Sequence, residues 1–311
     1  MTKPKIAVVV GPTASGKTGT AVALAKLLKG EVISADSMQI YRHMDVGTAK
    51  PTVQEMDGVP HHLVDCVDPD EDYSVARFKA EALAAIEDIC SRGHQPIVAG
   101  GTGLYVNGLT LPWGFRAKDT DEAVRATLEQ EAAQMGNEAF HRLLAAVDPQ
   151  SATEIHPNNV KRVVRALEIY RVTGKTKSQL DAEARTETLP YNYVLMGIAM
   201  DRAQLYERVN RRVDLMVEAG LIEEIRRLLS MGYSPELPAL KAIGYKELFP
   251  YLRGEMPLAE ALRILKRDTR HFAKRQLTWF RKDERIAWFD AGVYPDTKTM
   301  AAAMKNYFEK A

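Results

Sequence analysis

The 311-residue sequence has only two cysteines, Cys66 and Cys90, and no apolar run long enough to cross a membrane. Two cysteines make no disulfide framework and are too few for a structural zinc site. The chain also lacks a signal peptide pattern, because an apolar strand pattern begins at Lys5. Internal repeats and low-complexity tracts are absent too. We therefore expect a cytoplasmic protein with no membrane segment.

The chain has almost no excess of either charge, since its formal net charge is +1. Its basic residues are nevertheless concentrated. Residues 257–282 hold eight lysines and arginines against two acids, and residues 158–177 hold six against one. A solvated helix face is the commoner explanation for a single basic helix, but two such segments favour a polyanionic partner, either RNA or DNA.

The first hundred residues alternate between apolar runs and amphipathic patterns. They predict strands at 5–10, 31–36, 61–67 and 95–101, with helices at 18–29 and 74–93. This order is typical of an α/β fold with a P-loop-type parallel sheet core flanked by helices on both faces.

The pattern changes after Trp113, because residues 121–174 show only helical periodicity. A strand pattern returns at 192–200. We expect an all-helical insertion domain at 114–189 within a catalytic core formed by residues 1–113 and 190–311. For the rest of the core we predict helices at 202–219, 221–231, 240–252 and 257–281, and an edge strand at 286–290.

A phosphate-binding loop follows the first predicted strand. The segment GPTASGKT matches G-x-x-x-x-G-K-[ST] and lies between a strand and a helix, as that motif requires. Its backbone N–H groups surround phosphate oxygens, Lys17 adds a positive charge, and Thr18 reaches a bound Mg²⁺. The predicted phosphate-binding residues are Gly11, Pro12, Thr13, Ala14, Ser15, Gly16, Lys17 and Thr18.

The loop lacks the partner that a nucleotide hydrolase needs. Such enzymes hold Mg²⁺ with an acid at the end of a core strand, but the strand QPIVAG ends in Gly100 and Gly101. The acid placed to face the loop is Asp36, at the carboxyl end of the second predicted strand, where ligands of parallel sheets bind. Asp36 in this position also suits a turn cap, and the two roles are compatible.

The ordered segments GPTASGKT, ISADSMQIYR, VGTAKPT, VPHHLVD, YSVARFKAEA and VAGGTGLY resemble the tRNA dimethylallyltransferases. NNVKRVVRALEIYRVTGKT, LYERVNRRVDLMVEAGLIEE, LKAIGYKEL and KRQLTWFRK continue the resemblance along nearly the whole chain. It implies that the loop holds the diphosphate of dimethylallyl diphosphate, a leaving group, so no strand-end acid is needed. Because the zinc finger of eukaryotic relatives is missing, the sequence is similar to the bacterial members.

The resemblance implies a reaction in which the N6 amine of an adenine in a tRNA anticodon loop displaces diphosphate. The amine is a poor nucleophile, and Asp36 is the expected base that accepts its proton. Lys17, Arg212 and Mg²⁺ beside Thr18 are expected to stabilise the departing diphosphate. From spacing alone, Arg212 is equally compatible with a surface position on a helix.

The expected tRNA contacts surround the predicted base and extend into the basic segments. They are Asp36, Ser37, Met38, Gln39, Thr102, Arg125, Lys161, Arg162, Val163, Val164, Arg165, Lys241, Ala242, Ile243, Gly244, Tyr245 and Lys246. On the long helix at 257–281, two adjacent rows form a basic stripe: Lys266, Arg270 and Lys274, and Arg267, His271 and Arg275.

Three other functions remain open at this point. A prenyltransferase acting on free AMP or ADP shares the first motifs, and a P-loop small-molecule kinase shares the phosphate loop. An RNA-binding protein with a degenerate site is disfavoured by intact Lys17, Thr18 and Asp36. The resemblance implies dimethylallyl diphosphate, the tRNA anticodon stem-loop and Mg²⁺ as partners, and we expect a monomer.

Overall fold

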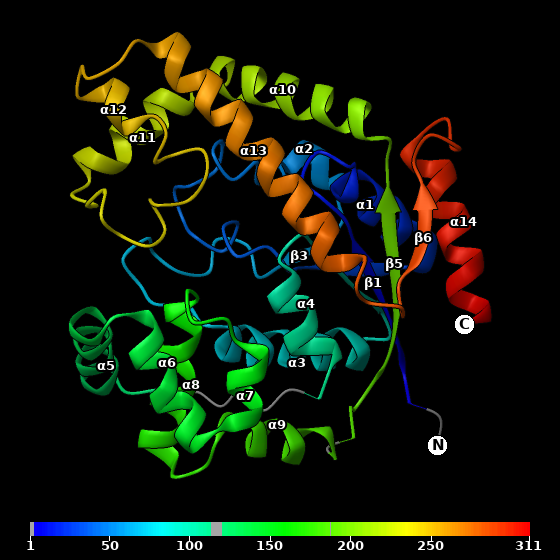
Figure 1. Ribbon diagram of the computed structural model, residues 1–311. Coiled ribbons are helices and arrows are strands. Elements are labelled where there is room, and N and C mark those ends of the chain that lie inside the picture. The colour runs from blue at the N-terminus through cyan, green and yellow to red at the C-terminus, as the bar shows by residue number, and fades with distance from the viewer. Residues whose placement is uncertain (1–2, 113–119, 187) are drawn as a thin grey trace. The chain divides into compact units, whose positions relative to one another are not determined.

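One parallel sheet organises the core of the molecule. The computed structural model describes residues 3–112, 120–186 and 188–311. Six strands lie in the order β3-β2-β4-β1-β5-β6, and every neighbouring pair is parallel, which confirms the expected sheet (Figure 1). The strands are β1 (Lys5–Val10), β2 (Gly30–Ser34), β3 (His61–His62), β4 (Gln95–Gly100), β5 (Asn192–Ala199) and β6 (Ala287–Asp290).

Helices cover both faces of this sheet because its crossovers run in both directions. The chain moves one way across the sheet through α1 (Lys17–Leu28), from β1 to β2, and the other way through α3 (Val75–Ser91), from β3 to β4. Right-handed crossovers in opposite directions place their helices on opposite faces. Between β5 and β6 lie α10 (Arg202–Glu218) and α13 (Leu258–Phe280), which run side by side, whereas α14 (Thr297–Lys310) packs against α1 (Figure 1).

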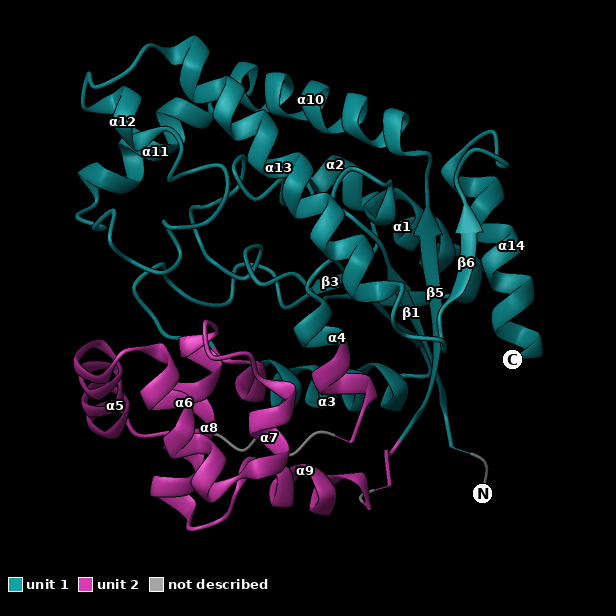
Figure 2. Cartoon of the chain, viewed as in Figure 1, with its two compact units in different colours: residues 1–73, 78–106, 191–311 teal, residues 74–77, 107–190 magenta. Residues whose placement is uncertain are grey.

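The chain forms two compact units (Figure 2). Residues 1–73, 78–106 and 191–311 form unit 1, and residues 74–77 and 107–190 form unit 2. The expected boundary at 113/114 lies outside the described residues. The remaining helices of unit 1 are α2 (Val53–Met56), α11 (Leu221–Ser230) and α12 (Phe249–Leu252), and α4 (Gly103–Thr110) crosses from one unit to the other.

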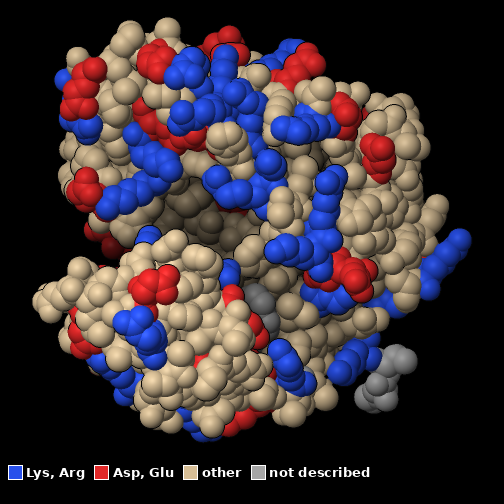
Figure 3. Space-filling view, viewed as in Figure 1, with Lys and Arg blue, Asp and Glu red and all other residues tan. Residues whose placement is uncertain are grey.

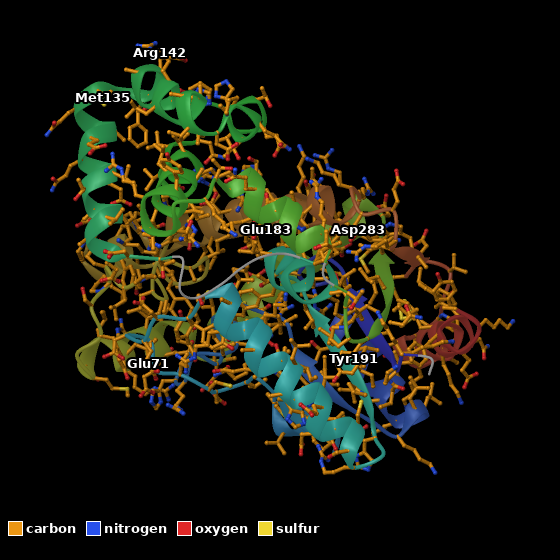
Figure 4. The ribbon with its side chains drawn as sticks, turned by 90° about the horizontal axis from the view of Figure 1, so that it is seen from below. Glu71, Met135, Arg142, Glu183, Tyr191 and Asp283 are labelled. Atoms are coloured by element: carbon orange, nitrogen blue, oxygen red, sulfur yellow. The ribbon has the colours of Figure 1, made fainter. Side chains whose placement is uncertain are left out.

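The described secondary structure of unit 2 consists of helices joined by short connections. Its helices are α5 (Glu122–Met135), α6 (Asn137–Val147), α7 (Pro149–Glu154), α8 (Val160–Thr173) and α9 (Lys177–Arg185). Leu128, Phe140 and Leu144 meet in its apolar core. Met135 and Arg142 of this unit, both labelled in Figure 4, have exposed side chains.

Two predicted elements differ from the structure for backbone reasons. The strand predicted at 61–67 is only His61–His62, because Leu63 and Asp65 adopt positive φ angles of 59° and 56° and end the extended conformation. The helix predicted at 240–252 is helical only at Phe249–Leu252, after a series of turns in which Gly244 has φ 108°. Helices α4 and α14 were not predicted. Among the described residues, no helix is both long and apolar enough to span a membrane.

Candidate functional site

A cavity of about 360 Å³ opens at the carboxyl ends of the central strands of unit 1. Its walls come from the phosphate loop and α1, the segment after β2, the turn after β4, the inner faces of α10 and α13, and the loop at 241–246. Ligands of parallel α/β sheets bind at this edge, and the volume suits a small substrate. This position makes the cavity the candidate active site.

The phosphate loop lies at one wall of the cavity. Gly16 has φ 93°, a left-handed conformation that glycine adopts without strain, and it is the N-cap residue of α1. Thr13, Lys17 and Thr18 line the cavity, whereas Gly11, Pro12 and Ser15 are buried and do not line it. The Nζ of Lys17 donates a hydrogen bond of 2.7 Å to the carbonyl of Pro12. Ala14 and Gly16 are half-buried.

Lys17, Asp36 and Arg212, the three predicted catalytic residues, line this same cavity. Burial lowers the pKa of Lys17 to about 8; the carboxylate of Asp36 opposes this shift, and the cation of Arg212 adds to it. Burial also lowers the pKa of Arg212, again opposed by Asp36. Arg212 is therefore no surface arginine: it is half-buried, on the inner side of α10.

Asp36 begins a hydrogen-bonded turn. Its Oδ1 accepts the backbone N–H of Met38 at 2.9 Å, so the turn cap anticipated from the sequence is present. The next residue, Ser37, donates its backbone N–H to the Oγ1 of Thr102 at 2.9 Å. The Gln39 side chain bonds within the protein, accepting from Ser34 at 3.1 Å and donating to the carbonyl of Ala49 at 3.2 Å. All of the predicted residues 36–39 and Thr102 line the cavity.

The loop at 241–246 supplies another wall. Lys241, Ala242, Ile243, Gly244 and Lys246 line the cavity. Tyr245 does not: its side chain is 0% exposed in the core, and its hydroxyl donates a hydrogen bond of 2.8 Å to Glu224. The prediction that Tyr245 contacts tRNA is therefore corrected, because the side chain stabilises the loop from within.

Unit 2 carries the remaining predicted tRNA contacts. Val163 and Val164, at 0% and 2% exposed, belong to its apolar core, so their side chains are not available to a partner and that prediction is corrected.

Two arginines of unit 2 share one buried acid. Arg125 and Arg165 pair with the carboxylate of Glu168, at 3.0 and 2.9 Å, so part of their charge is neutralised within the protein. Lys161 and Arg162 are exposed on α8, and no described residue is paired with either side chain.

The basic stripe on α13 is partly neutralised. Lys266 pairs with Asp214 on α10 at 2.6 Å, Arg267 pairs with Asp268 at 2.7 Å, and Arg270 donates to Asn210 at 2.6 Å. Lys274 and Arg275 are exposed. Figure 3 shows lysine and arginine side chains gathered over α10 and α13.

The side chains of the cavity can bind Mg²⁺ only together with oxygens of a bound substrate. Its described lining contains one carboxylate, Asp36, and the hydroxyl of Thr18. No cluster of three or more acidic, histidine or cysteine side chains suited to a metal occurs among the described residues. Mg²⁺ prefers oxygen ligands, keeps several waters and is commonly bound by one or two protein oxygens together with substrate phosphates. The donors present fit that mode.

Two polar residues important to the site were not predicted. Gln276 of α13 is 7% exposed and bonds to the phosphate loop, with its Oε1 accepting the backbone N–H of Thr13 at 2.8 Å. Its spacing from Ala273 and Phe280 places a polar residue on the buried face of the helix, which was a detectable pattern.

Glu224 of α11 is also buried and holds a loop that lines the cavity. It accepts the backbone N–H groups of Asp45, Val46 and Gly47 at 2.8, 2.7 and 2.9 Å. No sequence pattern indicates these contacts, because the partners are separated from Glu224 by more than 170 residues.

Comparison with known proteins places the chain among relatives that match it along almost its whole length. The family model "IPP transferase" matches residues 39–283, and "Isopentenyl transferase" matches residues 4–66. The tRNA dimethylallyltransferase of Acetivibrio thermocellus is 51% identical over 302 residues, covering 97% of this chain and 96% of the relative.

Solved structures agree with this match. The tRNA isopentenylpyrophosphate transferase of Bacillus halodurans is 47% identical, with a TM-score of 0.72 and 99% of each chain covered. A eukaryotic dimethylallyltransferase acting on tRNA is 31% identical, with a TM-score of 0.82, covering 99% of this chain and 80% of its own. The chain therefore belongs to the IPP transferase family, that of the tRNA dimethylallyltransferases.

Proposed function

We propose that this protein transfers the dimethylallyl group of dimethylallyl diphosphate to the N6 amine of an adenine in a tRNA anticodon loop, releasing diphosphate. The observation that carries the proposal is the charge pattern of the cavity. Its described lining contains a single carboxylate, Asp36, and five cations, Lys17, Arg212, Lys241, Lys246 and Arg275. This excess of cations suits a diphosphate and an RNA phosphate backbone, and it leaves Asp36 as the candidate base.

The transfer forms one bond and breaks one. The N6 lone pair attacks the primary allylic carbon, the carbon–oxygen bond to diphosphate breaks with its electrons going to the diphosphate, and the proton leaves N6 for Asp36. The Oδ1 of Asp36 is fixed by the backbone N–H of Met38, which orients the carboxylate while the second oxygen can accept the amine hydrogen. Asp36 thereby raises the reactivity of an amine whose lone pair is delocalised into the ring.

The departing diphosphate gains negative charge as the bond breaks. Lys17 and Arg212 line the cavity and stabilise that charge, together with loop N–H groups other than those of Thr13 and Ser15, which bond within the protein. Thr18 would hold Mg²⁺ together with the bound diphosphate, and the ion would neutralise part of the charge of the leaving group. Apolar residues of α10 and α13, including Val209, Val213 and Phe272, provide a surface for the dimethylallyl group.

The acceptor is inferred to be RNA because exposed cations occur in both units. Lys161 and Arg162 of unit 2 and the exposed Lys274 and Arg275 of α13 are suited to phosphate contacts. An adenine in a single-stranded loop leaves its stack at a cost of only a few kcal/mol, so it can enter a pocket. We further infer that the protein works in the cytoplasm and is a monomer. Size-exclusion chromatography with light scattering tests the monomeric state.

The deciding experiment offers labelled dimethylallyl diphosphate to the protein with tRNA, AMP or ATP as acceptor. We expect label in tRNA alone, on adenine N6, with one diphosphate released per transfer and no ATP consumed. Label in AMP with unmodified tRNA supports the free-nucleotide prenyltransferase instead. ATP hydrolysis coupled to product formation supports a small-molecule kinase and overturns the proposal.

A further inference from the structure

A single amide on α13 joins the two sides of the cavity. The Oε1 of Gln276 accepts the backbone N–H of Thr13 in the phosphate loop at 2.8 Å. Its Nε2 donates to the backbone carbonyl of Gly101, in the turn after β4, at 2.9 Å. The side chain is 7% exposed and uses both ends of its amide, so its orientation is fixed by the two bonds it makes.

The Gly101 turn leads directly to the predicted base. Thr102 follows Gly101, and its Oγ1 accepts the backbone N–H of Ser37 at 2.9 Å, next to Asp36. A continuous path of hydrogen bonds and backbone therefore runs from the phosphate loop through Gln276 to the Asp36 turn. In this path Gln276 is the bridge between the donor side and the acceptor side.

Glycine at position 101 makes this bridge possible. A Cβ there would lie 2.3 Å from the Nε2 of Gln276, much closer than real contacts allow. The absence of a side chain thus lets the amide approach the turn closely enough to bond to its carbonyl. The backbone N–H of Thr13 is occupied by Gln276 rather than left for a phosphate, so this contact serves to place the loop.

We propose that Gln276 is a positioning residue that sets the separation between the diphosphate on the phosphate loop and the adenine amine at Asp36. The proposal rests on the proposed function, since it concerns the geometry of that transfer. Reacting atoms must lie within about 3–3.5 Å, and a displacement of 1 Å costs on the order of 10²-fold in rate. A side chain that ties the two binding walls together controls that separation.

The test is Gln276→Met, which keeps the length of the side chain and removes both hydrogen bonds. Exposed Gln134 of α5, changed to Met in the same way, is the matched control. With tRNA and dimethylallyl diphosphate both saturating, we expect the single-turnover rate constant of Gln276→Met to fall by about 10- to 100-fold. The dissociation constant for tRNA stays within about twofold, because phosphate contacts elsewhere supply most of that affinity.

A merely structural role gives a different result. If Gln276 only supports packing, fewer molecules are active, so the amplitude of the single turnover falls while its rate constant stays within twofold of wild type. That outcome overturns the proposal. An inactive wild-type protein instead refutes the proposed function, and the two failures are thereby distinguished.

Two further variants keep the proposal testable if Gln276→Met does not fold. Gln276→Glu retains the acceptor for Thr13 and loses the donor to Gly101, so we expect a rate constant between those of wild type and Gln276→Met. Gly101→Ala displaces the same amide, so its effect should not add to that of Gln276→Glu in the double variant. A wild-type rate constant in Gln276→Glu, or fully additive losses in the double variant, contradicts the proposal.

Discussion

Binding of the diphosphate should weaken as pH rises through about 8, because Lys17 loses its proton there. Burial lowers the pKa of Lys17 to about 8, and only the protonated form attracts a phosphate oxygen. A bound polyanion raises that pKa, so binding takes up a proton in this range. By linkage, the affinity is constant below pH 8 and then falls about tenfold per pH unit, to roughly a hundredth of its value at pH 10.

Isothermal titration with diphosphate and excess Mg²⁺, between pH 6.5 and 10, measures this dependence. Heats in two buffers of different ionisation enthalpy count the proton taken up. Lys17→Arg is the control, since an arginine keeps its charge over the whole range and should give a flat profile above pH 8. A flat profile in the wild-type protein as well refutes the assignment of the charge to Lys17.

The charges of Asp36 and Arg212 allow a second test of the pH dependence, because they act on Lys17 in opposite directions. The carboxylate of Asp36 raises the pKa of Lys17 and Arg212 lowers it. Asp36→Asn should therefore move the inflection to lower pH, and Arg212→Gln should move it to higher pH. A shift in the same direction for both variants contradicts the charge arrangement described for the cavity.

Three other predictions concern the surroundings of the site. Replacing Lys161 and Arg162 by Ala should weaken tRNA binding. The slope of log affinity against log salt concentration should fall by about 1.4, or 0.7 per lost phosphate contact. Unchanged affinity and slope in a filter-binding titration would show that this part of α8 faces solvent in the complex. Val164→Ala should lower the free energy of unfolding by about 2 kcal/mol, because a nearly fully buried side chain is shortened. The tRNA dissociation constant should not change. A loss of tRNA affinity without a loss of stability would show that Val164 contacts tRNA after all. Glu224→Ala leaves three backbone donors and one hydroxyl without their acceptor. The free energy of unfolding measured by urea denaturation should therefore fall by roughly 3 kcal/mol. A fall below about 1 kcal/mol would mean that water replaces the carboxylate.

The order of strands and helices could be predicted because buried parallel strands are short apolar runs separated by amphipathic helices. That pattern depends on local sequence, as in Lys5–Val10 and Asn192–Ala199. The predictions were wrong where backbone conformation ended an element, as at Leu63 and Asp65 after β3. No apolar pattern indicates a positive φ at such residues.

The candidate site was predictable where a motif carried the chemistry. Lys17 and Asp36 follow β1 and β2, whose carboxyl ends lie at one edge of the sheet, and Arg212 of α10 lines the same cavity although it is far from both in sequence. The roles of Val164 and Tyr245 were not predictable from their position within basic segments, because burial depends on the packing of the whole unit. Glu224 was missed because its partners are distant in sequence, whereas Gln276 was missed although a polar residue on the buried face of α13 was a detectable pattern.

The central claim is that Asp36 accepts the proton of the adenine amine, and Asp36→Asn tests it most directly. The substitution keeps the size of the side chain and the acceptor for the N–H of Met38 but cannot take up the proton. With both substrates saturating, the account predicts that the single-turnover rate constant falls by about 10²–10⁴-fold, with tRNA binding nearly unchanged and exposed Asp70→Asn, the matched control, fully active. A rate constant for Asp36→Asn within a few fold of wild type would contradict the account and leave Asp36 as a cap for its turn.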